Sequence, residues 1–196
     1  MKSETGKVSL RKQFITCAAL SVLAAVVILL FHRKPYFPAP LFGLSVWHQS
    51  FLGIAVGALY WVVTLLGAKF VANRNTTQSI AESYSRLDLS GWNPLGMAVA
   101  AGFGEELLFR GALQPLVGIW VTSVLFVLVH IRAYRLNKLD KRVLFQSISI
   151  FAISVVLGYV AAYAGLITAM IIHVAMDIVG LVAVRRMTHV AATAAA

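Results

Sequence analysis

The stretch FITCAALSVLAAVVILLF, residues 14–31, carries no charged side chain over 18 consecutive positions. A helix needs about 20 mainly apolar residues to cross the hydrocarbon core of a bilayer. With the basic residues ahead of it, this stretch also has features of a signal peptide, but its apolar part is long for one and similar segments follow. We therefore expect a retained first transmembrane helix at residues 14–31.

The composition of the whole chain agrees with a membrane protein. Of the 196 residues, 60% are hydrophobic and only 12% are charged. A soluble domain is usually about half apolar and about a quarter charged, so its surface could not hide this much apolar area from water. We expect an all-α, polytopic helix bundle that forms one integral membrane domain over residues 1–196, with the lipid bilayer as its solvent.

Five further apolar segments are separated by helix-breaking or polar residues. Residues 73–92 are polar and predict a loop, and Pro94 suits the first turn of the helix that follows. One helix over residues 143–184 would be about 63 Å long, more than a bilayer is thick, so we place a break at Gly165. The expected additional spans lie within 41–71 and at about 94–115, 116–131, 143–164 and 166–184.

The basic residues are distributed unevenly about these six spans. Fourteen Lys and Arg residues fall on the side that holds both termini, against Arg33 and Lys34 on the other side. Cytoplasmic loops of membrane proteins carry such an excess, which predicts cytoplasmic N- and C-termini. Because topology explains the formal net charge of +10, we expect no nucleic-acid partner.

Several ionisable residues fall inside the predicted spans. A charged side chain in mid-bilayer costs about 2.5–3.5 kcal/mol even on the most lenient scale, so such residues usually pair with one another in the bundle interior and serve a function. The intramembrane residues are Glu105, Glu106, Arg110, His130, His173 and Asp177.

Their spacing predicts which of them share a helix face. Glu106 and Arg110 are four residues apart and form an expected ion pair, whereas Glu105 points about 100° away and needs no share of that arginine. His173 and Asp177 have the same spacing. A free glutamate near histidines is suited to take a proton from water as a general base.

Each feature also has a purely structural interpretation. The Glu106–Arg110 pair can serve stability alone, and His130 can be an interfacial residue near a helix end. His173 and Asp177 can form an interhelical hydrogen-bonding pair. Glu105 has no such role, because it is an unpaired acid beside a paired one.

The motifs of other intramembrane proteases are absent from the sequence. It contains no His-Glu-x-x-His, no Gly-x-Ser-Gly, no Gly-x-Gly-Asp and no glycine-rich phosphate loop. Cys17 is the only cysteine, which excludes an internal disulfide. The remaining histidines and the tryptophans lie near predicted span ends or on packing surfaces: His32, His48, His189, Trp47, Trp61, Trp92 and Trp120.

Three motifs, in order along residues 92–181, resemble those of the CAAX protease and bacteriocin-processing (CPBP, or Abi) family. They are Glu-Glu-x-x-x-Arg at Glu105, Glu106 and Arg110, Phe-x-x-x-His at Phe126 and His130, and His-x-x-x-Asp at His173 and Asp177. The resemblance implies a glutamate-type intramembrane endopeptidase whose catalytic core is residues 92–181, with no metal and no cofactor.

The resemblance also implies a role for each residue of the motifs. Glu105 would activate the attacking water with the help of His130, and His173 with Asp177 would stabilise the oxyanion. Glu106, Arg110 and Phe126 would support the site. Asp177 stands where the prenyl-protein enzymes typically have Asn, and an ionised carboxylate cannot donate a hydrogen bond. Asp177 is therefore either protonated or orients His173.

Six spans are fewer than the eight of the eukaryotic-type enzymes of this family. We therefore expect a bacterial inner-membrane protein whose substrate is not a prenylated CAAX protein. The expected partner is a membrane-associated peptide or protein, such as a leader peptide, a signalling peptide or a membrane-anchored sorting tail.

Three other functions compete with this interpretation. The chain can be a non-catalytic scaffold or immunity protein of the same family. A transporter or proton relay also uses buried Glu, His and Asp, but the first two spans carry almost no polar residues and no inverted repeat is visible. A zinc-dependent membrane protease would use Glu105, His130 and His173 as metal ligands.

Overall fold

The computed structural model describes residues 7–32, 43–71, 87–131 and 141–193. Within these ranges the secondary structure is helical apart from an isolated bridge between Val8 and Leu87, so the predicted all-α class is confirmed. The elements are α1 (Leu10–Phe31), α2 (Val46–Val71), α4 (Asn93–Glu106), the π-helix η2 (Leu107–Leu113), α5 (Gln114–His130), α6 (Lys141–Tyr163) and α7 (Leu166–Thr193).

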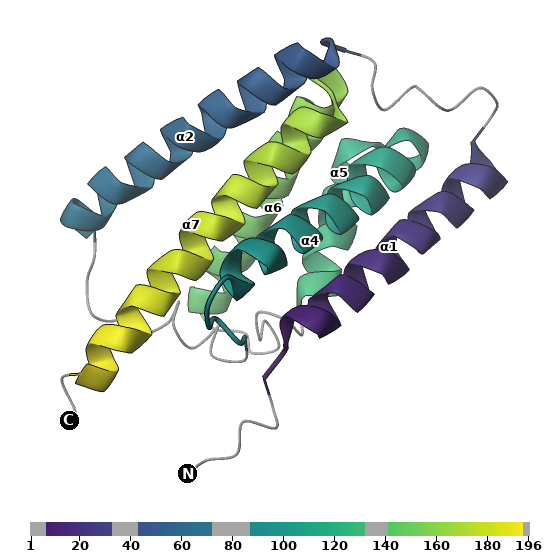
Figure 1. Cartoon of the computed structure of the whole chain (residues 1–196). Helices are drawn as coiled ribbons and strands as arrows, with labels where there is room; N and C mark the ends of the chain where they lie inside the picture. Colours follow the sequence, from purple (N-terminus) through teal and green to yellow (C-terminus); the bar gives the residue numbers. More distant parts are fainter. Residues whose placement is uncertain (1–6, 33–42, 72–86, 132–140, 194–196) are drawn as a thin grey trace.

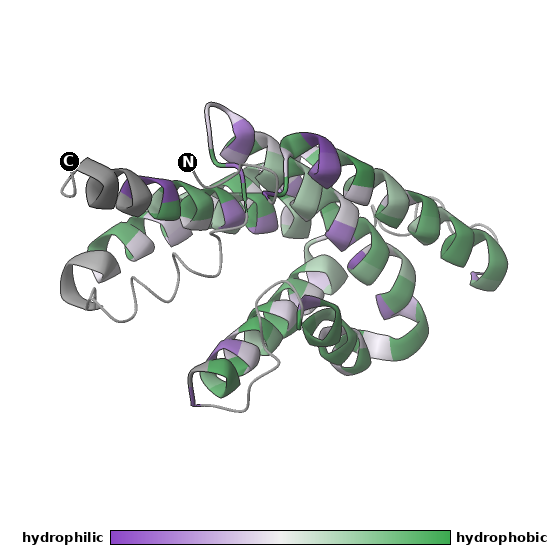
Figure 2. Cartoon of the chain, turned by 90° about the horizontal axis from the view of Figure 1, so that it is seen from below, coloured by the Kyte–Doolittle hydropathy of each residue, from purple (hydrophilic) through white to green (hydrophobic). Residues whose placement is uncertain are grey.

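Membrane-length apolar helices make up most of the described chain. Five segments are long and apolar enough to cross a bilayer: Leu10–Phe31, Val46–Gly67, Asn93–His130, Val143–Tyr163 and Leu166–Arg186. Large apolar side chains such as Leu29, Phe51 and Phe145 are exposed on their outer faces. Hydrophobic residues run along the helices in Figure 2, and hydrophilic ones are few. The predicted polytopic membrane bundle is confirmed.

The 38-residue segment Asn93–His130 folds back on itself. Along one straight helix Glu105 and His130 would be about 37 Å apart, yet Glu105 Oε2 lies 3.6 Å from His130 Nε2. The chain reverses at Gly118, whose φ of 80° and ψ of 168° are not helical. The two limbs correspond to the two spans expected at 94–115 and 116–131.

The position of this reversal differs from the prediction. The expected spans 94–115 and 116–131 meet after Pro115, but Pro115 lies in the first turn of α5. A proline fits there because the first residues of a helix need no hydrogen bond from their N–H groups. The break comes three residues later, at the glycine.

Gly118→Ala should lower the thermal stability of the protein by several degrees. The backbone conformation of Gly118 is essentially restricted to glycine and costs another residue about 1–3 kcal/mol. A Cβ at Gly118 would meet no atom within 4 Å, so any loss comes from the backbone and not from a clash. Thermal unfolding in detergent measures it.

Gly67→Ala is the matched control for this experiment. Gly67 lies inside α2 without a positive φ, and its Cβ would also meet nothing within 4 Å. Alanine there should leave the unfolding temperature unchanged or raise it slightly, since glycine inside a helix is destabilising by about 0.5–1 kcal/mol. Equal effects of the two substitutions would mean that Gly118 does not set the reversal.

The other predicted boundaries agree with the structure to within a few residues, except that α7 continues to Thr193, beyond the predicted span 166–184. The long apolar run 143–184 breaks at Gly165, where φ is 115°, as expected. The first helix ends at Phe31 as predicted but begins at Leu10, because the Ser9 side chain accepts a hydrogen bond from the Lys12 backbone N–H. Helix α2 covers Val46–Val71, within the predicted range 41–71. Most of the predicted loop 73–92 lies outside the described residues.

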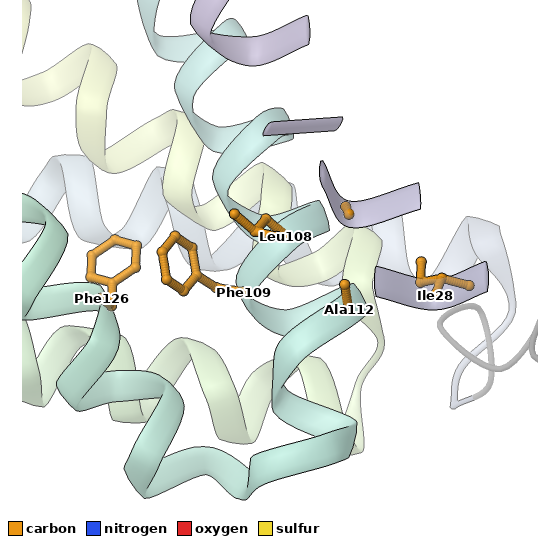
Figure 3. Packing of buried hydrophobic residues seen from close by; sticks show 6 residues of the cluster. Ile28, Leu108, Phe109, Ala112 and Phe126 are labelled. Atoms are coloured by element: carbon orange, nitrogen blue, oxygen red, sulfur yellow. The ribbon is translucent and has the colours of Figure 1, made fainter. Parts of the chain in front are cut away.

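The helices pack so that α7 is central (Figure 1). Helix α7 contacts α2, α4 and α6, and α1 packs against α4 and η2. In Figure 3, Ile28 of α1 lies by Leu108 and Ala112 on one side of η2, while Phe109 faces Phe126 of α5 on the other. This arrangement fixes η2 between α1 and α5.

Both ends of the described chain lie at the same end of the bundle. Val8, just before α1, pairs with Leu87, and Arg185 near the end of α7 donates to the carbonyl of Gly91. The start of α1 and the end of α7 also lie towards the same end of the bundle in Figure 1. The sequence predicted this common side from its basic residues.

Close helix contacts set the position of Glu105. A Cβ on Gly102 would lie 2.6 Å from Val174 Cγ2 of α7, and one on Gly104 would lie 3.0 Å from Cys17 Cα of α1. Glycine therefore lets α4 approach both neighbours closely. These two close contacts hold the backbone around Glu105 between α1 and α7.

Candidate active site

The Glu106–Arg110 ion pair predicted from spacing is present and fully buried. Arg110 Nε lies 3.3 Å from Glu106 Oε2, and neither side chain is exposed to solvent. Arg110 Nη2 also donates to the carbonyl and the hydroxyl of Ser154 in α6, at 3.2 and 3.1 Å. The pair thus joins the end of α4 to η2 and α6.

The second oxygen of Glu106 holds His173 in place. His173 Nδ1 lies 2.7 Å from Glu106 Oε1, across the contact between α4 and α7. Because Arg110 pairs with this carboxylate, the imidazole Nδ1–H is the donor. The sequence predicted Glu106 as support for the site but did not predict this bond, since no local signal connects residues so far apart in the chain.

His130 is oriented by the end of its own helix. Its Nδ1 lies 2.7 Å from the Phe126 carbonyl oxygen, which can only accept, so Nδ1 carries the hydrogen. The His130 ring also lies 4.3 Å from the Phe126 ring, and the Arg110 guanidinium lies 4.8 Å from the same ring. Phe126 therefore contacts both a predicted catalytic residue and the buried ion pair.

Glu105 lies where the two imidazoles converge. Its Oε2 is 3.6 Å from His130 Nε2 and 3.9 Å from His173 Nε2. Asp177 Oδ2 lies 3.8 Å from the same His173 nitrogen. The structure thus brings together all four residues for which the sequence predicted a catalytic role, from α4, α5 and α7.

These distances are too long for direct hydrogen bonds but suit a shared small ligand. A water oxygen placed beside the Glu105–His130 pair, off the line that joins the two atoms, would be within hydrogen-bonding reach of both. In both histidines Nδ1 is committed to donating, so Nε2 is the nitrogen that exchanges a proton. The Glu105 carboxylate and the two imidazole Nε2 atoms therefore face one point.

Exposure divides the site into two parts. The side chains of Glu105, His130 and His173 are 17%, 13% and 11% exposed, and Asp177 is 27% exposed, whereas Glu106 and Arg110 are inaccessible. A substrate can therefore contact Glu105 and Asp177 but not the Glu106–Arg110 pair.

The donor atoms also bear on the zinc alternative. Two imidazoles and a carboxylate are groups that zinc accepts, but among the described residues no group of three or more His, Cys, Asp or Glu is arranged to hold a metal ion.

The residues assigned to span ends have varied surroundings. His32 is not simply interfacial, because its Nε2 lies 2.8 Å from the Ala112 carbonyl oxygen and so joins α1 to η2. His48 is exposed near the start of α2, next to Ser45. The four tryptophans are exposed, as expected of lipid-facing or interfacial residues. The side chain of His189 lies outside the described part of the structure.

Comparison with known proteins relates the region that contains the site to a described family. Residues 89–179 match the Rce1-like family, described as type II CAAX prenyl endopeptidase Rce1-like. This match agrees with the expected resemblance to the CAAX protease family. The matched region is slightly less than half of the chain and contains all three motifs, from Glu105 to Asp177.

A curated relative and the solved structures add little about function. The chain is 37% identical over 84 residues to the uncharacterized protein YpbD of Bacillus subtilis (strain 168). This matched stretch covers 42% of this chain and 41% of YpbD. The chain thus matches about two fifths of the length of this relative. No solved structure matches the chain.

Proposed function

We propose that the protein is an intramembrane endopeptidase that uses Glu105 to activate water against a peptide bond. The observation that carries the proposal is the convergence of Glu105 Oε2 with the Nε2 atoms of His130 and His173, at 3.6 and 3.9 Å. A carboxylate and an imidazole that reach one water are suited to general-base catalysis. The CAAX protease relationship supports peptide-bond hydrolysis as the reaction.

In the proposed reaction, Glu105 takes a proton from the water as the water oxygen attacks the peptide carbonyl. The carbonyl electrons move onto oxygen and form a tetrahedral oxyanion. His173, protonated on both nitrogens, donates from Nε2 to this oxyanion, which is worth about 2.7–4 kcal/mol per donor in other hydrolases. The proton then passes from Glu105 to the leaving amine as the C–N bond breaks.

Other residues of the site position these groups. Glu106 fixes the His173 ring through Nδ1, and the Phe126 carbonyl fixes His130 in the same way. Asp177, four residues from His173 and 3.8 Å from its Nε2, orients this imidazole and stabilises its positive charge. We assign the catalytic core to residues 92–181 within a single membrane domain over residues 1–196.

The depth of the site indicates the kind of substrate. Glu105 lies 12 residues after Asn93, about 18 Å along α4 from the end of the bundle that carries most of the basic residues. A peptide bond must therefore enter the bilayer to be cleaved. We propose a membrane-associated peptide or membrane-anchored protein tail as substrate, in a bacterial inner membrane with both termini of the enzyme cytoplasmic.

A cleavage assay in lipid vesicles tests this function. The purified protein is reconstituted with a library of peptides that carry an apolar membrane anchor, and products are identified by mass. Defined cleavage is expected close to the anchor, and the same peptides without the anchor should remain intact. A folded protein that cleaves no anchored peptide, under conditions where a known intramembrane protease cleaves its own substrate, would instead support the scaffold function.

A further inference from the structure

Among the described residues, five buried side-chain atoms have no hydrogen-bond partner. Two of them, Glu106 Oε2 and Arg110 Nε, face each other in the ion pair, and the other three lie behind the candidate site. They are Arg110 Nη1, Gln114 Oε1 and Thr122 Oγ1. Arg110 and Thr122 are almost completely inaccessible. Buried polar groups in proteins are nearly always hydrogen-bonded, to protein or to ordered water, so each of these atoms requires a partner.

Arg110 and Gln114 belong to one interface with α6. Arg110 Nη2 donates to Ser154, and Gln114 Nε2 donates to the Gly158 carbonyl oxygen at 2.9 Å. The donors Arg110 and Gln114 are four residues apart, and so are the acceptors, residues 154 and 158. The two contacts therefore lie one helical turn apart along the interface. Arg110 and Gln114 thus each donate from one of their nitrogens to an oxygen of α6. Arg110 Nη1 and Gln114 Oε1 have no hydrogen-bond partner among the described residues.

Thr122 is buried on the returning limb, and helical spacing assigns it to the same interface. Phe126 faces the Arg110 guanidinium, and Thr122 is one turn from Phe126 towards the reversal at Gly118. Gln114 is one turn from Arg110 in the same direction. Because the two limbs are antiparallel, Thr122 is placed beside Gln114. A Cβ on Gly158 would lie 2.8 Å from both Gln114 Oε1 and Ile119 Cγ2, which locates α5 against the same point of α6.

The hydrogen-bonding roles of these three atoms determine which kind of ligand could bind all of them. Arg110 Nη1 can only donate, Gln114 Oε1 can only accept, and the Thr122 hydroxyl does both. An anion would face the Gln114 oxygen unfavourably, and a cation would be repelled by Arg110. Water both donates and accepts, and buried waters typically bind about three otherwise unsatisfied polar groups.

We propose that Arg110, Gln114 and Thr122 form a buried water-binding site between η2, α5 and α6, separate from the water that Glu105 activates. Water here completes the hydrogen bonding of Arg110. Since Arg110 pairs with Glu106, and Glu106 holds His173, this water site belongs to the framework that positions the catalytic imidazole.

The sign of the stability change in Thr122→Val tests the proposal without any activity assay. Valine has nearly the shape of threonine but no hydroxyl. If water binds here, the substitution removes one of its partners and the unfolding temperature should fall by about 2–4 °C. If no water binds these atoms, valine only removes a hydroxyl group that has no partner, and the unfolding temperature should be unchanged or higher.

Two further variants attribute the change to the hydroxyl. Thr122→Ser keeps it and should stay closer to wild type than Thr122→Val. Thr64→Val in α2 is the matched control, because the Thr64 hydroxyl donates to the Tyr60 carbonyl within its own helix, and it should change the unfolding temperature less. A Thr122→Val protein at least as stable as wild type, or a Thr122→Ser protein as unstable as Thr122→Val, would overturn the water site.

A double-mutant cycle provides a second criterion. Thr122→Val and Gln114→Met should be non-additive if both residues bind the same water, because the first substitution already weakens its binding. Strict additivity of the two changes in unfolding temperature would show that they share no ligand and would reject the proposal.

Discussion

Glu105→Gln is expected to reduce peptide cleavage by about 10²–10⁴-fold, the usual contribution of a general base, while leaving the protein folded. Glutamine matches glutamate in size but cannot take a proton from water. The fold should tolerate it because Glu105 is partly exposed and Arg110 is already paired with Glu106. Cleavage rates and thermal unfolding of both proteins, measured in the same detergent, test the two statements together.

Glu105→Asp is the informative control for this substitution. It keeps the carboxyl group but withdraws it by one methylene from the two imidazoles. Its activity should lie between those of the wild type and Glu105→Gln. Full activity of the glutamine variant would mean that another group activates the water.

Glu106→Gln is expected to destabilise the protein by about 3–5 kcal/mol, the typical effect of removing one partner of a buried ion pair. The substitution leaves Arg110 as an uncompensated charge in the bundle interior. It also weakens the acceptor that fixes His173 Nδ1, so cleavage should fall as well. Chemical or thermal unfolding measures the first effect.

Asp177→Asn is the matched comparison, because it also neutralises one carboxyl group near His173. Asp177 is 27% exposed and forms no ion pair with Arg110, so its stability loss should be much smaller. If Glu106→Gln and Asp177→Asn were equally stable, the Glu106–Arg110 pair would not hold the helices together as inferred.

Local patterns were sufficient to predict several parts of this structure. The uncharged run before Phe31 predicted the end of α1, and the length of 143–184 required the break found at Gly165. The four-residue spacing of Glu106 and Arg110 predicted their ion pair. Each of these features depends on residues close together in the sequence, where helical geometry alone determines the outcome.

Features that depend on distant residues were not predictable in this way. The bond between His173 and Glu106 requires the packing of α7 on α4, and the contact of His32 with Ala112 requires that of α1 on η2. The boundary between the spans expected at 94–115 and 116–131 lies at Gly118, because the backbone conformation at the turn requires glycine. The π-helix Leu107–Leu113 had no signal in the sequence.

The central claim is that the Glu105 carboxylate, and not a metal ion, activates the water. Two histidines and a glutamate that face one point are also the groups that would bind zinc, so cleavage and metal content must be measured on the same sample. After prolonged dialysis against EDTA and 1,10-phenanthroline, the enzyme should retain full cleavage activity and contain no stoichiometric zinc. Loss of activity on chelation, restored by added zinc, would contradict the account and make Glu105, His130 and His173 metal ligands.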